Sequence, residues 1–178
     1  MKFKSVAMLG ELCHPGARRL ATKGLMMREN CTVLLVENNP DDARLAQLAF
    51  ERGRVGHELA IVADGEGAMQ FLKAEGQYKT RSGRALPKLI LLDLGMPGVS
   101  GLEFLEQLRR EPVLREIPVT ILSGSSYSPD VKRAQELGAR SFLEKTADLR
   151  QFTDALKAAV DCVLGAVSPP PRLRLSCG

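Results

Sequence analysis

The sequence has no apolar run long enough to cross a membrane, no closely spaced cysteines and few aromatic residues. Although 44% of its 178 residues are hydrophobic, none of the runs approaches the roughly 18 residues that a membrane-spanning helix needs. The four cysteines, Cys13, Cys31, Cys162 and Cys177, lie far apart without a CxxC pair. Disulfides and a zinc site are therefore not expected, and the chain is typical of a reduced, cytoplasmic, globular protein. Its length suits one domain with a proper core.

A basic face of the kind that binds nucleic acid is also missing. The formal net charge is +4, but the excess of basic residues lies in residues 1–30 and at Arg172 and Arg174. Between Cys31 and Val167 the chain carries 17 basic and 19 acidic residues, and aromatic residues make up only 4% of the whole. Nucleic-acid binding is not expected, because it calls for basic residues interleaved with aromatic ones.

Apolar segments alternate with helix signals from Cys31 onward. We expect strands at 32–37, 58–63, 88–93, 118–123 and 141–144. The first, third and fourth are almost wholly apolar, which is typical of parallel strands covered on both faces. Helix starts are predicted at Asn39-Pro40, at Ser100 with Glu103 as a capping box, at Ser128-Pro129 and at Thr146. Right-handed crossovers would fold this order into a three-layer α/β sandwich.

The organisation predicted from these patterns is one folded domain with two extra ends. Residues 1–30 read as a flexible N-terminal extension, residues 31–167 as the domain, and residues 168–178 as a proline-rich tail. Residues 76–87 read as a polar surface insertion. The apolar positions of the last helix, from Leu149 to Val167, approximate a heptad pattern. That pattern fits either a homodimer contact at the helix end or a single amphipathic core helix.

Polar residues end four of the five predicted strands: Glu37-Asn38, Asp93, Ser123 and Lys145. In open parallel sheets the carboxyl ends of the strands form the binding edge. Each residue has an ordinary explanation by itself, since Asp93 suits a turn, Ser123 a loop and Lys145 a solvated surface. Their joint placement favours a common site.

The segments "LLVENNPDD", "LILLDLGMPGVSGLEFL", "VTILSGSS" and "FLEK" carry these residues, spaced by 30 residues from Asp93 to Ser123 and by 22 from Ser123 to Lys145. Together, from Cys31 to about Leu164, they resemble a response-regulator receiver domain, the CheY-like family of two-component signalling. The resemblance implies a flavodoxin-like (βα)5 sandwich with a parallel sheet of order 2-1-3-4-5. The polar insertion resembles the single-domain regulators that partner phytochrome-type histidine kinases.

The resemblance also implies a role for each site residue. Asp93 would accept a phosphoryl group from a kinase histidine. Mg²⁺ would be held by Glu37, Asp93, the backbone carbonyl of Gly95 and, less surely, Asn38. Lys145 and Ser123 would stabilise the phosphoryl group, and Phe142 would change its packing, altering the surface of the fourth helix, fifth strand and fifth helix.

Asn38 departs from the family pattern, in which two consecutive acids end the first strand. Glu37 and Asp93 supply a charge of −2 rather than −3, so we expect roughly ten-fold weaker Mg²⁺ binding. Two interpretations stay open. Either phosphorylation persists with a greater need for Mg²⁺, or this is a degenerate receiver that acts as a phosphorylation-independent adaptor or dimerisation module. Gly95, where the family often has a longer polar side chain, predicts an altered lifetime of the phosphorylated state.

A rival reading is an enzyme, a phosphatase of the haloacid-dehalogenase type. That class also places an aspartate after an apolar strand, but it needs a second acid two residues later, where this chain has Gly95. The chain is therefore predicted not to be an enzyme. No output domain fits after Val167, so its output is predicted to be contact with a partner protein.

Overall fold

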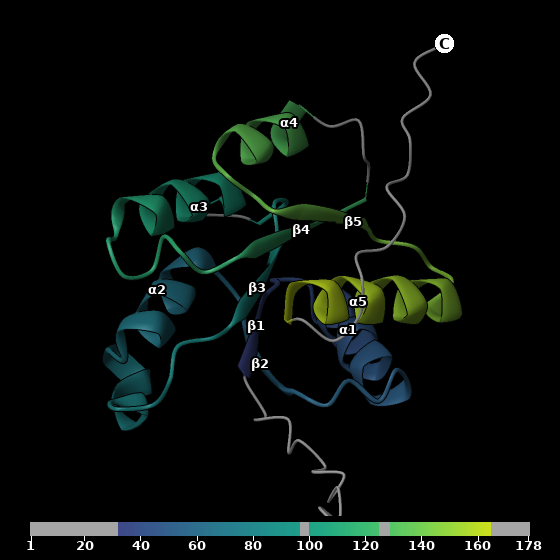
Figure 1. Cartoon of the computed structure of the whole chain (residues 1–178), viewed down its shortest axis with the longest axis horizontal. Helices are drawn as coiled ribbons and strands as arrows, with labels where there is room; N and C mark the ends of the chain where they lie inside the picture. The colour runs from purple at the N-terminus through teal and green to yellow at the C-terminus, as the bar shows by residue number, and fades with distance from the viewer. Residues whose placement is uncertain (1–31, 97–99, 125–128, 165–178) are drawn as a thin grey trace, which may run out of the picture.

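The computed structural model describes residues 32–96, 100–124 and 129–164 (Figure 1). The strands are β1 (Thr32–Val36), β2 (Glu58–Val62), β3 (Leu89–Asp93), β4 (Val119–Ser123) and β5 (Ser141–Glu144). The helices are α1 (Pro40–Arg52), α2 (Gly65–Lys73), the 3₁₀ helix η1 (Gly76–Arg81), α3 (Gly101–Arg110), α4 (Pro129–Glu136) and α5 (Leu149–Leu164). The predicted extension and tail lie outside the described residues, so the domain boundaries stay predictions.

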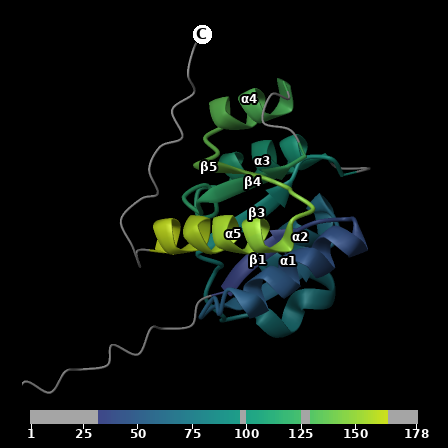
Figure 2. The ribbon, with the colours of Figure 1, turned by 90° about the vertical axis from the view of Figure 1, so that its right-hand side faces the viewer.

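All five strands are parallel and pair in the order β2-β1-β3-β4-β5. Helices α1 and α5 lie together on one face of the sheet, and α2, α3 and α4 cover the other (Figures 1 and 2). The predicted three-layer sandwich and its strand order are therefore confirmed. None of the helices in the described ranges is long and apolar enough to span a membrane.

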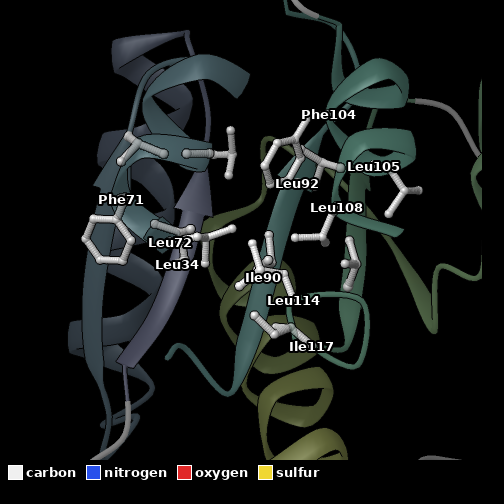
Figure 3. Close-up of a cluster of buried hydrophobic side chains, with 14 of the residues drawn as sticks. Leu34, Phe71, Leu72, Ile90, Leu92, Phe104, Leu105, Leu108, Leu114 and Ile117 are labelled. Carbon is white, nitrogen blue, oxygen red and sulfur yellow. The ribbon is translucent and has the colours of Figure 1, made fainter. Parts of the chain in front are cut away.

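Helices cover both faces of the sheet, and successive side chains of a strand point to opposite faces. Every apolar side chain of the central strands is therefore buried. In β1, Leu34 and Val36 pack into the core under α2 and α3, whereas Val33 and Leu35 pack under α1 and α5. All four are fully buried. Figure 3 shows the first of these cores, with Leu34, Ile90 and Leu92 of the sheet facing Phe71 and Phe104 from the helices. The continuous apolar runs in the sequence reflect this two-sided burial.

The helix starts follow local capping chemistry with one correction. Asn39 caps α1 by accepting hydrogen bonds from the backbone N–H groups of Asp41 and Asp42. Ser100 and Glu103 form the predicted capping box of α3. The prediction that Thr146 caps the last helix is wrong, because the Asp148 carboxylate accepts from the first N–H groups of α5. The Thr146 hydroxyl instead accepts from the Asp148 N–H at 3.2 Å.

The segment predicted to be a polar insertion has more structure than expected. Its first half forms η1, whose Tyr78 packs edge-on against Phe71 of α2 with ring centroids 5.2 Å apart. The Arg81 guanidinium lies over the same ring, 3.6 Å from its centroid. An aromatic ring and a cation therefore hold the insertion to the sandwich.

Arg109, in the last turn of α3, joins three parts of the fold. Its guanidinium donates hydrogen bonds to the carbonyls of Arg115 and Ile117, in the loop before β4. It also donates to the carbonyls of Leu137 and Gly138, which directly follow α4. These four bonds fix the end of α4 against α3.

Candidate functional site

The predicted site residues lie at one edge of the sheet because the strands are parallel. Glu37 directly follows β1, Asp93 and Ser123 end β3 and β4, and Lys145 directly follows β5. The register pairs Asp93 with Leu122, the residue before Ser123. The Lys145 backbone N–H donates to the Ser123 carbonyl at 2.8 Å, which holds the lysine beside the end of β4.

The Lys145 ammonium is the centre of the site. Its Nζ lies 2.6 Å from Glu37 Oε2, 2.9 Å from Asp42 Oδ2 and 3.2 Å from Asp93 Oδ1. The Lys145 side chain is only 18% exposed. Three carboxylates, from the end of β1, from α1 and from β3, therefore surround one largely buried cation that comes from the end of β5.

Burial and pairing change the protonation equilibria of this cluster. Burial of the Glu37 carboxyl raises its pKa, even though hydrogen bonds from Lys145 and from the Asn39 N–H favour the ionised form. Burial acts to lower the pKa of Lys145, but the hydrogen bonds to Glu37 and Asp42 together with the charge attraction of Asp93 and Glu37 outweigh it, and the pKa is raised. The lysine is therefore held in its charged form.

Asp93 is buried, and its carboxylate has room on the side of Gly95. A Cβ atom at Gly95 would lie 3.7 Å from Asp93 Oδ2 and 3.9 Å from Oδ1, which is ordinary van der Waals contact. The glycine therefore leaves space beside the carboxylate that a side chain would occupy. At Gly101 there is no space for a side chain, because a Cβ there would overlap the Asp93 carbonyl oxygen.

The donor set fits a hard divalent cation that keeps much of its water. No group of three His, Cys, Asp or Glu side chains arranged to hold a metal ion occurs within the described ranges. Both Glu37 oxygens accept hydrogen bonds, from Asn39 and Lys145, and the Asn38 residue is exposed. The carboxylates of Glu37 and Asp93, the amide of Asn38 and the Gly95 carbonyl are all oxygen ligands. The position of the Lys145 ammonium shows that the cluster accepts positive charge.

Two predicted residues, Ser123 and Phe142, are not among the charged groups that contact Lys145 in the structure. Ser123 is half-buried at the end of β4, on the strand next to Asp93. Phe142 is half-buried on β5 and packs against the core under α2, α3 and α4.

Asp42 is a site residue that was not predicted from the sequence. An acid in the first turn of α1 is explained by the positive helix start alone, but the Asp42 carboxylate also accepts a hydrogen bond from Lys145. The two residues are 103 positions apart, and the "PDD" segment offers no local signal for that contact. Only the tertiary fold, in which the first turn of α1 and the residue after β5 meet at one edge of the sheet, brings them together.

Five parallel strands in this order, with a buried aspartate at the end of β3 beside a lysine that follows β5, define a receiver domain. Residues 33–157 match the family model described as the response regulator receiver domain, and the chain belongs to this family of two-component signalling proteins.

Other response regulators, one of them described as a phytochrome response regulator, are among its similar relatives. Response regulator Rcp1 of Synechocystis sp. is 36% identical over 138 residues, which cover 78% of this chain and 92% of Rcp1. The crystal structure of the phosphorylated cyanobacterial phytochrome response regulator RcpA has a TM-score of 0.68 at 35% identity, covering 79% of this chain and 99% of RcpA. The Mn²⁺-bound form of Rcp1 has a TM-score of 0.66 at 34% identity, covering 79% and 99% of the two chains.

Proposed function

We propose that this protein is a single-domain response regulator that accepts a phosphoryl group on Asp93 in the presence of Mg²⁺. The observation that supports this best is the placement of Asp93 within 3.2 Å of the charged Lys145, beside buried Glu37. A buried, ionised carboxylate next to a fixed cation is suited to take up a group that adds negative charge.

The chemistry assigned to Asp93 is attack by a carboxylate oxygen on the phosphorus of a kinase phosphohistidine. A P–O bond forms, the P–N bond breaks, and the electron pair remains on the histidine nitrogen. Lys145 donates to a phosphoryl oxygen and offsets the added charge. Ser123, from the neighbouring strand, donates its hydroxyl to another. Mg²⁺, held by Asp93, Glu37, the Gly95 carbonyl and Asn38, would supply further charge neutralisation.

The proposed output is a change of surface around α4, β5 and α5. Phe142 lies on β5 beside Ile121 of β4 and packs against the core under α2, α3 and α4. We expect a shift of Ser123, at the end of β4, toward the phosphoryl group to alter this packing. The proposed donor is a histidine kinase, and the similarity to the phytochrome response regulator RcpA favours one of the phytochrome type. A homodimer through the last helix and a cytoplasmic location stay predictions.

The test is intact-protein mass spectrometry after incubation with acetyl phosphate and Mg²⁺. We expect the mass of one phosphate to be gained by the wild type and not by Asp93→Ala. Asp130→Ala, a change of another acid on α4, is the matched control and should be phosphorylated like the wild type. A wild type that gains no phosphate would contradict the proposal.

A second function, that of a phosphorylation-independent adaptor, is favoured by one observation. The residue that follows Glu37, Asn38, is an exposed amide. This receiver therefore has one carboxylate after β1, where the family pattern has two. The same experiment separates the two functions, because an adaptor would bind its partner while taking up no phosphate.

A further inference from the structure

The Asp42 carboxylate accepts a hydrogen bond from the Lys145 ammonium on the solvent-exposed side of the site. It lies in the first turn of α1, where its backbone N–H donates to Asn39 Oδ1 at 3.4 Å. Its side chain is 37% exposed, whereas that of Glu37 is 1% exposed. Lys145 is therefore bound between a buried carboxylate and a carboxylate near the surface.

The three carboxylates do not share the ammonium equally. Lys145 Nζ donates hydrogen bonds of 2.6 Å to Glu37 and 2.9 Å to Asp42, and the contact with Asp93, at 3.2 Å, is the longest of the three. An ammonium has three hydrogens, and two of them are directed at Glu37 and Asp42. Asp42 thus draws Lys145 toward α1 and away from Asp93.

We propose that Asp42 is a positioning residue of this site: it holds Lys145 off Asp93 and supplies the negative charge that Asn38 lacks. This inference rests on the proposed function of Asp93. With Asp42 ionised, the charge around Lys145 is −3, the count that an acid at position 38 would otherwise give. Without it, Lys145 would move onto Asp93 and compete there with a divalent cation.

The variant Asp42→Asn tests this because it keeps the size of the side chain and removes its charge. Asp41→Asn is the matched control: Asp41 lies in the same first turn, is exposed, and its N–H is capped by the same Asn39 oxygen. Both variants lose one charge near the positive helix end, so both lose the same helix-dipole contribution. Only the first removes a partner of Lys145.

Two measurements test the inference, one on the Lys145 ammonium and one on metal binding. The first is the side-chain ammonium resonance of Lys145 by NMR, without metal or phosphate. We expect this resonance to shift in Asp42→Asn and to stay in place in Asp41→Asn. The second is the affinity for Mn²⁺, a spectroscopic substitute for Mg²⁺, by electron paramagnetic resonance. We expect about five-fold weaker binding in Asp42→Asn and none of this loss in Asp41→Asn.

A double variant can move the negative charge from position 42 to position 38. The double variant Asn38→Asp with Asp42→Asn has the net charge of the wild type, and we expect it to regain the Mn²⁺ affinity lost in Asp42→Asn. An unchanged Lys145 resonance or Mn²⁺ affinity in Asp42→Asn would overturn the inference, as would equal losses in Asp41→Asn. A wild type that takes no phosphate would instead contradict the proposed function, because the Lys145 resonance is measured without phosphate.

Discussion

Gly101 is the position at which one added methyl group should do most damage to the site. A Cβ there would overlap the Asp93 carbonyl oxygen and lie 2.8 Å from the Leu94 Cα and 3.1 Å from the Asp93 carbonyl carbon. Carbon atoms normally approach to 3.5–4.0 Å, so α3 and the β3 end would have to separate by about 1 Å. Overpacking typically costs ~1–3 kcal/mol. All three contacts are with backbone atoms, which cannot rotate away, so the upper part of that range applies.

A smaller gain opposes this cost. Alanine favours a helix over glycine by up to ~1 kcal/mol, but less at the first helical position, which Gly101 occupies. We therefore expect Gly101→Ala to lower the free energy of unfolding by about 2–3 kcal/mol and the melting temperature by roughly 5–10 °C. It should also slow phosphorylation of Asp93, because the residue that must move is the phosphoacceptor itself.

Urea unfolding followed by far-ultraviolet circular dichroism is the suitable assay, since the chain contains no tryptophan. Gly56→Ala is the control, because a Cβ at this exposed position would meet nothing within 4 Å, and its stability should change by less than ~0.5 kcal/mol. If Gly101→Ala were as stable as Gly56→Ala, the contact between α3 and the phosphoacceptor strand would be looser than described.

Three further substitutions test other parts of the argument. Asn38→Asp should bind Mg²⁺ about ten-fold more tightly and be phosphorylated faster by acetyl phosphate; equal affinity in the wild type would refute the charge argument. Replacing Gly95 by serine or asparagine should change the lifetime of the phosphorylated protein, followed as loss of the added mass over time, because the new side chain contacts the Asp93 carboxylate. An unchanged lifetime across both replacements would dismiss that role. Arg109→Ala should lower the free energy of unfolding by about 3 kcal/mol, because four backbone carbonyls lose a charged donor. If Arg109→Ala unfolded at the same urea concentration as the wild type, water would be replacing those four hydrogen bonds at little cost.

Asn38 and Asp42 together determine the charge around Lys145. The second acid predicted after β1 is an amide, Asn38, and a carboxylate from α1, that of Asp42, contacts the lysine. Three carboxylates lie within 3.2 Å of the Lys145 ammonium, and one of them comes from a helix. The order of Mg²⁺ affinities among Asn38→Asp, Asp42→Asn and the double variant would show how strongly the position of that charge matters.

The fold and most of the site could be predicted from local sequence because their signals lie within short segments. Strands buried on both faces must be apolar at every position, so β1, β3 and β4 appear as continuous hydrophobic runs. Parallel strands end at one edge, so the polar residues that follow them meet there. Asn39, Ser100 and Glu103 act through hydrogen bonds to N–H groups two or three residues away, which the chain order alone specifies.

Tertiary structure decided the features that depend on contacts between distant segments. Asp42 meets Lys145 across 103 residues, and Arg109 meets the end of α4 across 28. Neither contact has a signal in the residues around it. Thr146 was predicted to cap the last helix, and the actual first turn of α5 is capped by Asp148 instead. Local sequence determines which segments become strands and helices, but the partner of a long charged side chain depends on which elements pack beside it.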